Sequence, residues 1–167
     1  MQTDLFGTDL PRERVLMSLN PEYYELMWQR LKTHEFRRRY LAGRPTTWYV
    51  YLTAPTSRLA AVIDLDEAVA DSPQAIAAIA EHANPGNGES VYAYLKDLER
   101  GYALPIRTVR EYEGFTAEQL ATMLDGFHPP QGYTLIDKHP KWVRVCDQLA
   151  QAPVMRELVV AHPAPVS

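Results

Sequence analysis

Two strand-like segments separated by only a few residues restrict the fold of this chain more than any other feature. Residues 47–53 (TWYVYLT) and 58–65 (RLAAVIDL) are rich in β-branched and aromatic side chains, and only residues 54–57 join them. Parallel strands need a crossover of about a dozen residues or more, so this short connection predicts an antiparallel hairpin. The hairpin excludes a Rossmann-type sheet and indicates an α+β domain built around a curved sheet.

Segments with helix and strand patterns alternate along the rest of the chain. An apolar run at 15–19 and strand-like segments at 33–40, 102–109 and 133–136 bring the expected total to five or six short strands. The helical pattern recurs in six segments: 21–31, 72–82, 89–100, one beginning at 116, 140–150 and 153–161. Two helix starts carry capping residues, Asn20 before Pro21, and Thr116 three residues before Gln119.

Composition and length restrict the class of protein. With 167 residues, 46% of them hydrophobic and 23% charged, the chain has enough core for one domain and should bury roughly 70% of its unfolded surface. Cys146 is the only cysteine, which excludes an intrachain disulfide and any zinc site that needs two cysteines. The five histidines have no paired spacing and the sequence has no Gly-rich phosphate loop, so we expect no metal and no cofactor.

Nothing in the sequence has the pattern of a membrane or export segment. No apolar run approaches the roughly 20 residues that a membrane span needs. Residues 1–14 lack the apolar core of a signal peptide. We therefore expect a cytoplasmic protein with no membrane partner.

The charges are distributed unevenly. The formal net charge is -4, from 17 basic and 21 acidic side chains, which argues against a protein that coats nucleic acid through bulk charge. Residues 30–44 nevertheless carry six cations and one acid, +5 in all, and the rest of the chain carries -9. Such a patch attracts phosphates at short range, and arginine suits forked phosphate contacts. A solvated charged face is the structural alternative.

Three residues of this basic cluster have a spacing that suits a binding site. Lys32 lies between arginines, so like charges disfavour its ammonium form and favour its use as a base. Glu35 supplies the opposite charge and shares a face of the expected strand with Arg37. We hypothesise that the three side chains line a nucleotide-sized pocket.

Residues 32–37 (KTHEFR), which follow the expected helix at 21–31, resemble the signature of the ASCH family. This is the activating signal cointegrator homology branch of the PUA-like superfamily, and its signature is Gly-x-Lys-x-x-Glu-x-Arg. Lys32, Glu35 and Arg37 match three of the four positions, and Arg30 stands at the glycine position. The order of the later strand and helix segments also fits, so the resemblance covers about residues 14–137.

The resemblance implies a fold, a division of the chain and a ligand. The implied fold is α+β, a PUA-like small, partly closed β-barrel of five to six strands with surrounding helices and a C-terminal helical extension. The chain then divides into a lead-in at 1–13, the ASCH/PUA-like domain at 14–137 and the extension with its tail at 138–167. Family members are thought to bind RNA or nucleotides in a cleft beside the motif, so the implied partner is RNA or a modified nucleotide. The implied ligand-binding residues are Lys32, Glu35, Arg37, Arg38, Arg39, Arg44 and Arg30.

Three alternatives to a binding module stay open. One branch of the family hydrolyses acylated pyrimidine nucleosides such as N4-acetylcytidine with a lysine, a threonine and a glutamate. Lys32 matches the lysine, Glu35 stands where that branch has threonine, and Thr33 is close by. In such an enzyme Lys32 and Glu35 would be catalytic. Another branch cleaves RNA, and nothing in this sequence selects it. The third alternative is a protein-interaction domain whose partner docks on the C-terminal helices.

Two further groups of residues have a structural and a functional interpretation. Trp48, Tyr49 and Tyr51 could stack on bases, but alternating aromatics on a strand are more often core, and we favour the core interpretation. Alternation places Trp48 and Val50 on one face of the strand and the two tyrosines on the other. An acidic cluster at the end of 58–65 is interpreted as a solvated loop edge rather than a divalent-cation site: Asp64, Asp66 and Glu67.

Overall fold

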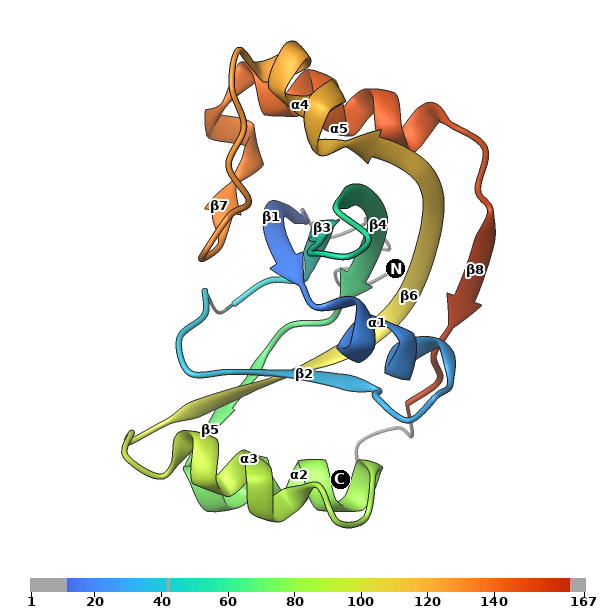
Figure 1. Ribbon diagram of the computed structural model, residues 1–167. Helices are drawn as coiled ribbons and strands as arrows, with labels where there is room; N and C mark the ends of the chain where they lie inside the picture. Colours follow the sequence, from blue (N-terminus) through green and yellow to red (C-terminus); the bar gives the residue numbers. More distant parts are fainter. Residues whose placement is uncertain (1–11, 42, 163–167) are drawn as a thin grey trace, which may run out of the picture.

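A curled sheet forms the centre of the molecule in the computed structural model, which describes residues 12–41 and 43–162 (Figure 1). Within these residues the sheet has eight strands: β1 (Glu13–Leu19), β2 (His34–Arg37), β3 (Thr46–Leu52), β4 (Arg58–Leu65), β5 (Val69–Asp71), β6 (Gly101–Thr116), β7 (Thr134–Leu135) and β8 (Arg156–Val159). The strand order is β2-β6-β4-β3-β1-β7, and β5 and β8 also pair with β6. Only the β1–β3 pair is parallel. The predicted curved sheet of an α+β fold is confirmed, with more strands than the five or six expected.

Helices cover the two ends of this sheet. The described residues form α1 (Pro21–Trp28), α2 (Pro73–Ala83), α3 (Gly88–Leu95), α4 (Ala117–Leu124), the 3-10 helix η1 (Ile136–Lys138) and α5 (Pro140–Gln151). In Figure 1, α4 and α5 lie at one end of the molecule, and α2 and α3 lie at the other, beside β2 and β5. The expected caps are confirmed: Asn20 accepts from the Glu22 N–H, and Thr116 and Gln119 form the reciprocal capping box. No helix among the described residues is both long enough and apolar enough to cross a membrane.

The hairpin predicted from the sequence is the pair β3–β4. The two strands pair antiparallel, from Thr46 opposite Leu65 to Leu52 opposite Arg58. Every residue of β3 is buried, because it lies between β1 and β4 with packed side chains on both of its faces. The hairpin therefore provides the rigid middle of the sheet against which the other elements pack.

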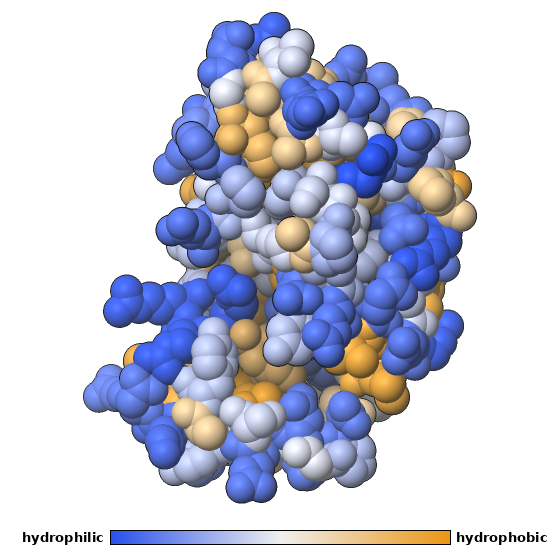
Figure 2. Space-filling view, in the orientation of Figure 1, coloured by the Kyte–Doolittle hydropathy of each residue, from blue (hydrophilic) through white to orange (hydrophobic). Residues whose placement is uncertain are grey.

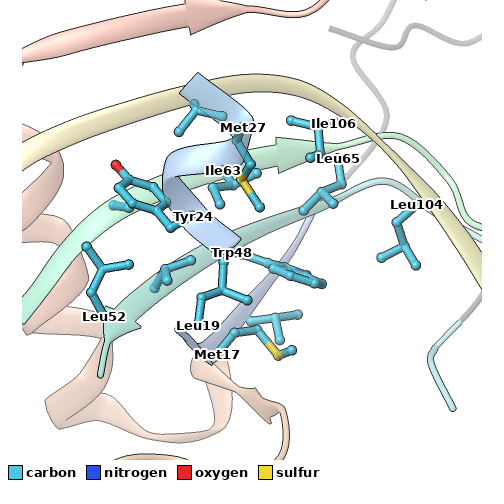
Figure 3. Close-up of a cluster of buried hydrophobic side chains, with 14 of the residues drawn as sticks. Met17, Leu19, Tyr24, Met27, Trp48, Leu52, Ile63, Leu65, Leu104 and Ile106 are labelled. Carbon is cyan, nitrogen blue, oxygen red and sulfur yellow. The ribbon is translucent and has the colours of Figure 1, made fainter. Parts of the chain in front are cut away.

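The aromatic residues of β3 belong to the two large cores. Trp48 and Val50 point into the main core, and Tyr49 and Tyr51 point into a second core on the other face of the sheet. Trp48 is fully buried, so the core interpretation of these aromatics is confirmed. The side chains around Trp48 include Met17, Leu19, Tyr24, Met27, Leu52, Ile63, Leu65, Leu104 and Ile106 (Figure 3).

A third, smaller core attaches the α2–α3 pair to β2 and β6. Ile76 and Ala80 of α2, Val91 and Leu95 of α3, and Ala103 of β6 form it, and Phe36 of β2 packs against it. Because alternate residues of a strand point to opposite faces, Phe36 and Glu35 lie on opposite sides of β2. Strand β2, which carries Glu35 and Arg37, is thus covered by helices on one face and faces the main core with the other.

Strand β6 carries the curl of the sheet. The sequence predicted a strand over 102–109 only, but β6 continues to Thr116, pairing first with β2 and β5 and then with β4 and β8. Gly114 has a φ of 74°, and a Cβ there would lie 2.0 Å from the carbonyl oxygen of Leu59. Only glycine allows β6 to approach β4 this closely, beside a register shift in the β4–β6 pairing.

The helix predicted at 153–161 is wrong. The structure has strand β8 (Arg156–Val159) there, paired antiparallel with residues 108–111 of β6. Leu158 and Val160 point into the main core and Val159 is exposed, so alternate residues face the core, as they do in a strand. The C-terminal extension is therefore a helix followed by a strand, and α5 also contributes to the second core through Val145 and Leu149.

Candidate nucleic-acid interface

A buried ion pair lies at the start of β2. The Nζ of Lys32 is 2.8 Å from Oε1 of Glu35, whose side chain faces the main core opposite Leu104 of β6. Glu35 is only 4% exposed, and its Oε1 has no hydrogen bond of normal geometry to any described residue. The charge of Lys32 therefore compensates a carboxylate that would otherwise be buried alone. The pairing also fixes the ammonium group in place as a hydrogen-bond donor.

Lys32 also forms part of the wall of a cavity of about 380 Å³, which we call the Lys32 cavity. The cavity lies between the end of α1, β2 and the α2–α3 pair, where Figure 2 shows apolar surface set back among hydrophilic side chains. The Lys32 Nζ is 5.5 Å from the ring centroid of Tyr23, within the range of a cation–π contact. The other lining residues are Leu26, Leu31, Phe36, Asn84, Asn87, Ser90, Val91 and Tyr94.

A second hollow, of about 320 Å³, contains the arginines that follow β2, and we call it the arginine hollow. In Figure 2 hydrophilic side chains project outward at the level of the end of β2. The lining residues are Arg37, Arg38, Arg39, Tyr94, Gly132 and Tyr133. Tyr94 thus lines both hollows, which makes them neighbours.

The arginines of this hollow differ in how far their charge is already compensated. Both Nη atoms of Arg38 donate to the carboxylate of Asp97, at 2.8 and 2.7 Å, and Nη1 also donates to the Tyr94 carbonyl. These hydrogen bonds lower the pKa of Asp97 to about 2. Arg37 and Arg39 form no ion pair with any residue in the described part of the chain. Two cations of the hollow are therefore available to an anionic ligand.

Tyr40 anchors the arginine segment to the main core. Its hydroxyl donates to Thr46 Oγ1 at 2.8 Å and accepts from Trp48 Nε1 at 2.6 Å. Burial raises the pKa of Tyr40, which keeps the phenol protonated as a donor. Because Tyr40 directly follows Arg39, this buried network fixes the end of the segment that carries the arginines.

Comparisons with known proteins identify the fold. No model of a known protein family matches the chain, and the search of curated proteins gave no match either. The crystal structure of the ASCH protein from Zymomonas mobilis matches with a TM-score of 0.67 at 23% identity, over 83% of this chain and 96% of that chain. Its tyrosine-to-phenylalanine variant matches with a TM-score of 0.69 at 20% identity, over 85% and 100% of the two chains. Its serine-to-alanine variant gives 0.68 at 21% identity, over 83% and 96%.

The chain has an ASCH domain fold. The fold expected from residues 32–37 is therefore confirmed. At these identities the likeness concerns the fold alone, so the ligand and the activity have to be argued from the residues of this chain.

The ASCH signature has glycine where this chain has Arg30, and the structure shows what that position requires. Helix α1 ends in a Schellman motif, in which the Arg30 N–H donates to the Met27 carbonyl and the Leu31 N–H donates to the Leu26 carbonyl. The residue after the C-cap of such a motif is left-handed, and Arg30 has a φ of 63°. Arg30 therefore carries strain that glycine would avoid, but the turn that presents Lys32 is retained.

The three residues that resemble the ASCH signature, Lys32, Glu35 and Arg37, do not line one common pocket. Glu35 and Arg37 share a face of β2, as alternation predicts, but Glu35 pairs with Lys32. Lys32 lines the first hollow and Arg37 the second, while Glu35 lines neither and lies buried beneath Lys32.

The remaining cations of the basic cluster lie outside both hollows. Arg44 is within 3.4 Å of the Glu13 carboxylate, and Arg30 is 3.4 Å from the Val159 carbonyl. Neither residue lines the Lys32 cavity or the arginine hollow. Of the predicted ligand-binding residues, Lys32 lines the first hollow with its charge compensated by Glu35, whereas Arg37 and Arg39 line the second with no ion pair to any described residue.

Several lining residues were not predicted from the sequence. Tyr94 fits the apolar stripe of α3, yet it is 44% exposed and lies between the two hollows. Asn84 and Asn87 lie on either side of a Pro-Gly turn, which the sequence marks as a break and not as a site. Within residues 12–41 and 43–162, no group of three or more His, Cys, Asp or Glu side chains is arranged to hold a metal ion.

Proposed function

We propose that this ASCH domain binds RNA or a nucleotide across the two hollows, with a base in the Lys32 cavity and phosphates at Arg37 and Arg39. The observation that carries this proposal is the position of Tyr94, which lines both hollows. In a nucleotide an aromatic base with hydrogen-bonding edges is joined to an anionic phosphate. The lining of the Lys32 cavity matches the base, and the cations of the neighbouring arginine hollow match the phosphate.

The Lys32 cavity has the size and lining that a base needs. Its volume of about 380 Å³ is within the usual range of small-ligand pockets. Tyr23 and Tyr94 are both exposed aromatics on which a base can stack, a contact worth about 1–3 kcal/mol per base. Asn84, Asn87 and Lys32 add amide and ammonium groups that can hydrogen-bond to base edges.

The arginine hollow has the charge that phosphates need. Arg37 and Arg39 have no acidic partner in the described part of the chain, and arginine presents a planar fork that matches a phosphate. The segment carries +5 on a body of -9, so attraction is local and the rest of the surface discourages indiscriminate binding. Tyr133 provides a further exposed ring in this hollow.

The salt dependence of RNA affinity tests the proposal. Fluorescence anisotropy with a labelled oligouridylate would be measured at a series of sodium chloride concentrations. Each single-strand phosphate that is neutralised contributes about 0.7 to the slope of log K against log salt. We expect the Arg37→Ala/Arg39→Ala variant to reduce that slope by about 1.4 and to weaken binding at low salt.

A charge-matched variant provides the control for this experiment. Arg100 and Arg144 are exposed and lie outside both hollows, so Arg100→Ala/Arg144→Ala removes the same charge elsewhere. This control is expected to keep the slope of the unmodified protein. Equal slopes for the two double variants would show that only overall charge matters and would overturn the proposal.

Binding is preferred here to hydrolysis of acylated nucleosides because of the contacts that Lys32 and Thr33 already make. The Nζ of Lys32 is engaged in an ion pair, 2.8 Å from the buried Glu35 carboxylate, and is therefore not free to attack a substrate. The nearby hydroxyl of Thr33 is already engaged, 2.9 Å from Nδ1 of His34. Incubation with N4-acetylcytidine discriminates the two functions: release of cytidine that stops in Lys32→Ala would replace the binding proposal by the hydrolase.

A further inference from the structure

A third hollow lies away from the proposed RNA site, and we call it the Asp64 hollow. Its volume is about 660 Å³, larger than either of the other two, and it shares no lining residue with them. It is formed by β3, β4, β6 and the chain at 159–162. The arginine, aspartate and threonine side chains of its lining are Arg12, Thr47, Asp64, Arg107, Thr108 and Arg110.

Asp64 organises one wall of this hollow. Its carboxylate accepts from Thr47 Oγ1 at 2.7 Å, from Thr108 Oγ1 at 2.8 Å and from Arg110 Nη2 at 3.2 Å. The sequence interpretation of Asp64 as part of a solvated loop edge is wrong, because it lies within β4 with its side chain only 22% exposed. The carboxylate is thus a fixed support for Arg110 rather than a free acceptor.

Arg107 and Arg110 retain donors that the protein does not use fully. The Nε of Arg110 is buried and has no hydrogen-bond partner in the described part of the chain. Arg107 is about half exposed and its ion pair is a loose one, with Nη1 3.5 Å from Asp66. A buried guanidinium donor without an acceptor is unfavourable, and an incoming anion would supply that acceptor.

The charge of the lining favours an anion over a cation. Arg12, Arg107 and Arg110 contribute three positive charges against the single negative charge of Asp64, a net of +2. Asp66, outside the lining, compensates Arg107 only loosely. An anion with two negative charges and several acceptor oxygens matches this wall, and those are the properties of a phosphate group.

We propose that the Asp64 hollow binds a phosphate-bearing small molecule, with the phosphate held by Arg107 and Arg110. The size of the hollow leaves room beyond the phosphate for the rest of a molecule as large as a mononucleotide. Arg12 is committed to the protein, because its guanidinium donates to Thr47 Oγ1 and to the Thr46 and Leu65 carbonyls. Arg107 and Arg110 are therefore the phosphate ligands.

Amide chemical shifts test this inference. The labelled full chain would be titrated with inorganic phosphate, and sodium chloride at equal ionic strength would serve as the reference. We expect saturable shifts of the amides at 107–110 and 159–162. Arg107→Ala and Arg110→Gln should each weaken the phosphate affinity at least about tenfold, as expected for the loss of a charge-assisted hydrogen bond.

Further variants make the result decisive. Arg107 is the more exposed of the two arginines, so Arg107→Ala tests the site even where Arg110→Gln perturbs the fold. Arg37→Ala/Arg39→Ala should leave the shifts at 107–110 and 159–162 unchanged. No saturable shift of these amides at about 10 mM phosphate, whether or not residues 37–39 shift, would overturn the inference. If the protein shows the phosphate shifts at 107–110 and 159–162 but does not bind RNA, the proposed function fails and the inference about the Asp64 hollow stands.

Discussion

Replacing Arg30 by glycine is expected to stabilise the protein, because Arg30 occupies the left-handed position of the Schellman motif that ends α1. Its φ is 63°, a conformation that places the Cβ of any residue other than glycine too close to the following carbonyl. The two hydrogen bonds that define the motif are made by backbone atoms of Arg30 and Leu31, so glycine would preserve both.

The expected gain follows from two opposing contributions. Left-handed strain in a residue with a Cβ amounts to about 1–2 kcal/mol. Glycine loses about 0.5–1 kcal/mol more conformational free energy on folding than alanine does. The side chain of Arg30 contributes little, because its contact with the Val159 carbonyl is 3.4 Å long and exposed to solvent. Arg30→Gly should therefore raise the free energy of unfolding by about 0.5–1 kcal/mol.

Equilibrium unfolding in urea measures this difference, with Arg30→Ala as the matched variant. Alanine removes the long side chain and its charge but keeps the Cβ, so Arg30→Ala should leave the free energy of unfolding nearly unchanged. In a protein of this size the glycine variant should also melt roughly 1–4 °C higher. If Arg30→Gly were no more stable than Arg30→Ala, the strain assigned to the turn before Lys32 would be refuted.

Three further changes test other parts of the structure. Lys32→Ala should lower the free energy of unfolding by about 3 kcal/mol, because the buried Glu35 carboxylate loses its cation. Adding Glu35→Gln should recover most of that loss, which a double-mutant cycle in urea measures. Gly114→Ala should destabilise by more than about 2 kcal/mol through the clash with Leu59, and an unchanged urea midpoint would contradict this. Burial, with a smaller contribution from His162, lowers the pKa of His34 from 6.5 to about 4. As the pH falls, His34 is protonated in the unfolded chain before it is protonated in the folded one. The contribution of neutral His34 to the free energy of unfolding is therefore complete above pH 6.5 and decreases as the pH falls toward 4. His34→Asn should flatten that part of the pH profile of urea midpoints.

Features fixed by a few neighbouring residues could be predicted from the sequence. The connection at 54–57 is too short for anything but a hairpin, and β3 and β4 form one. The capping box of Thr116 and Gln119 is likewise a local arrangement, and both of its hydrogen bonds are present. In these places the chain has few alternatives, so pattern and structure agree.

Features decided by distant parts of the chain could not be predicted. The segment of β8 contains arginine, glutamate and leucine, which are good helix formers, and it becomes a strand because β6 offers it a pairing edge. Tyr94 fits an apolar helix stripe, and its exposure depends on where the end of β2 lies relative to α3. The left-handed turn at Arg30 could not be predicted from the sequence either, because arginine is not a residue that favours this conformation.

The central claim is that a single RNA ligand occupies both the Lys32 cavity and the arginine hollow, with Tyr94 between them. Titration of labelled protein with a short oligouridylate, followed by amide chemical shifts, tests this most directly. We expect the amides around Lys32, Tyr94 and Arg39 to shift together with one common midpoint. Shifts confined to one hollow, or midpoints that differ between the two, would contradict the claim.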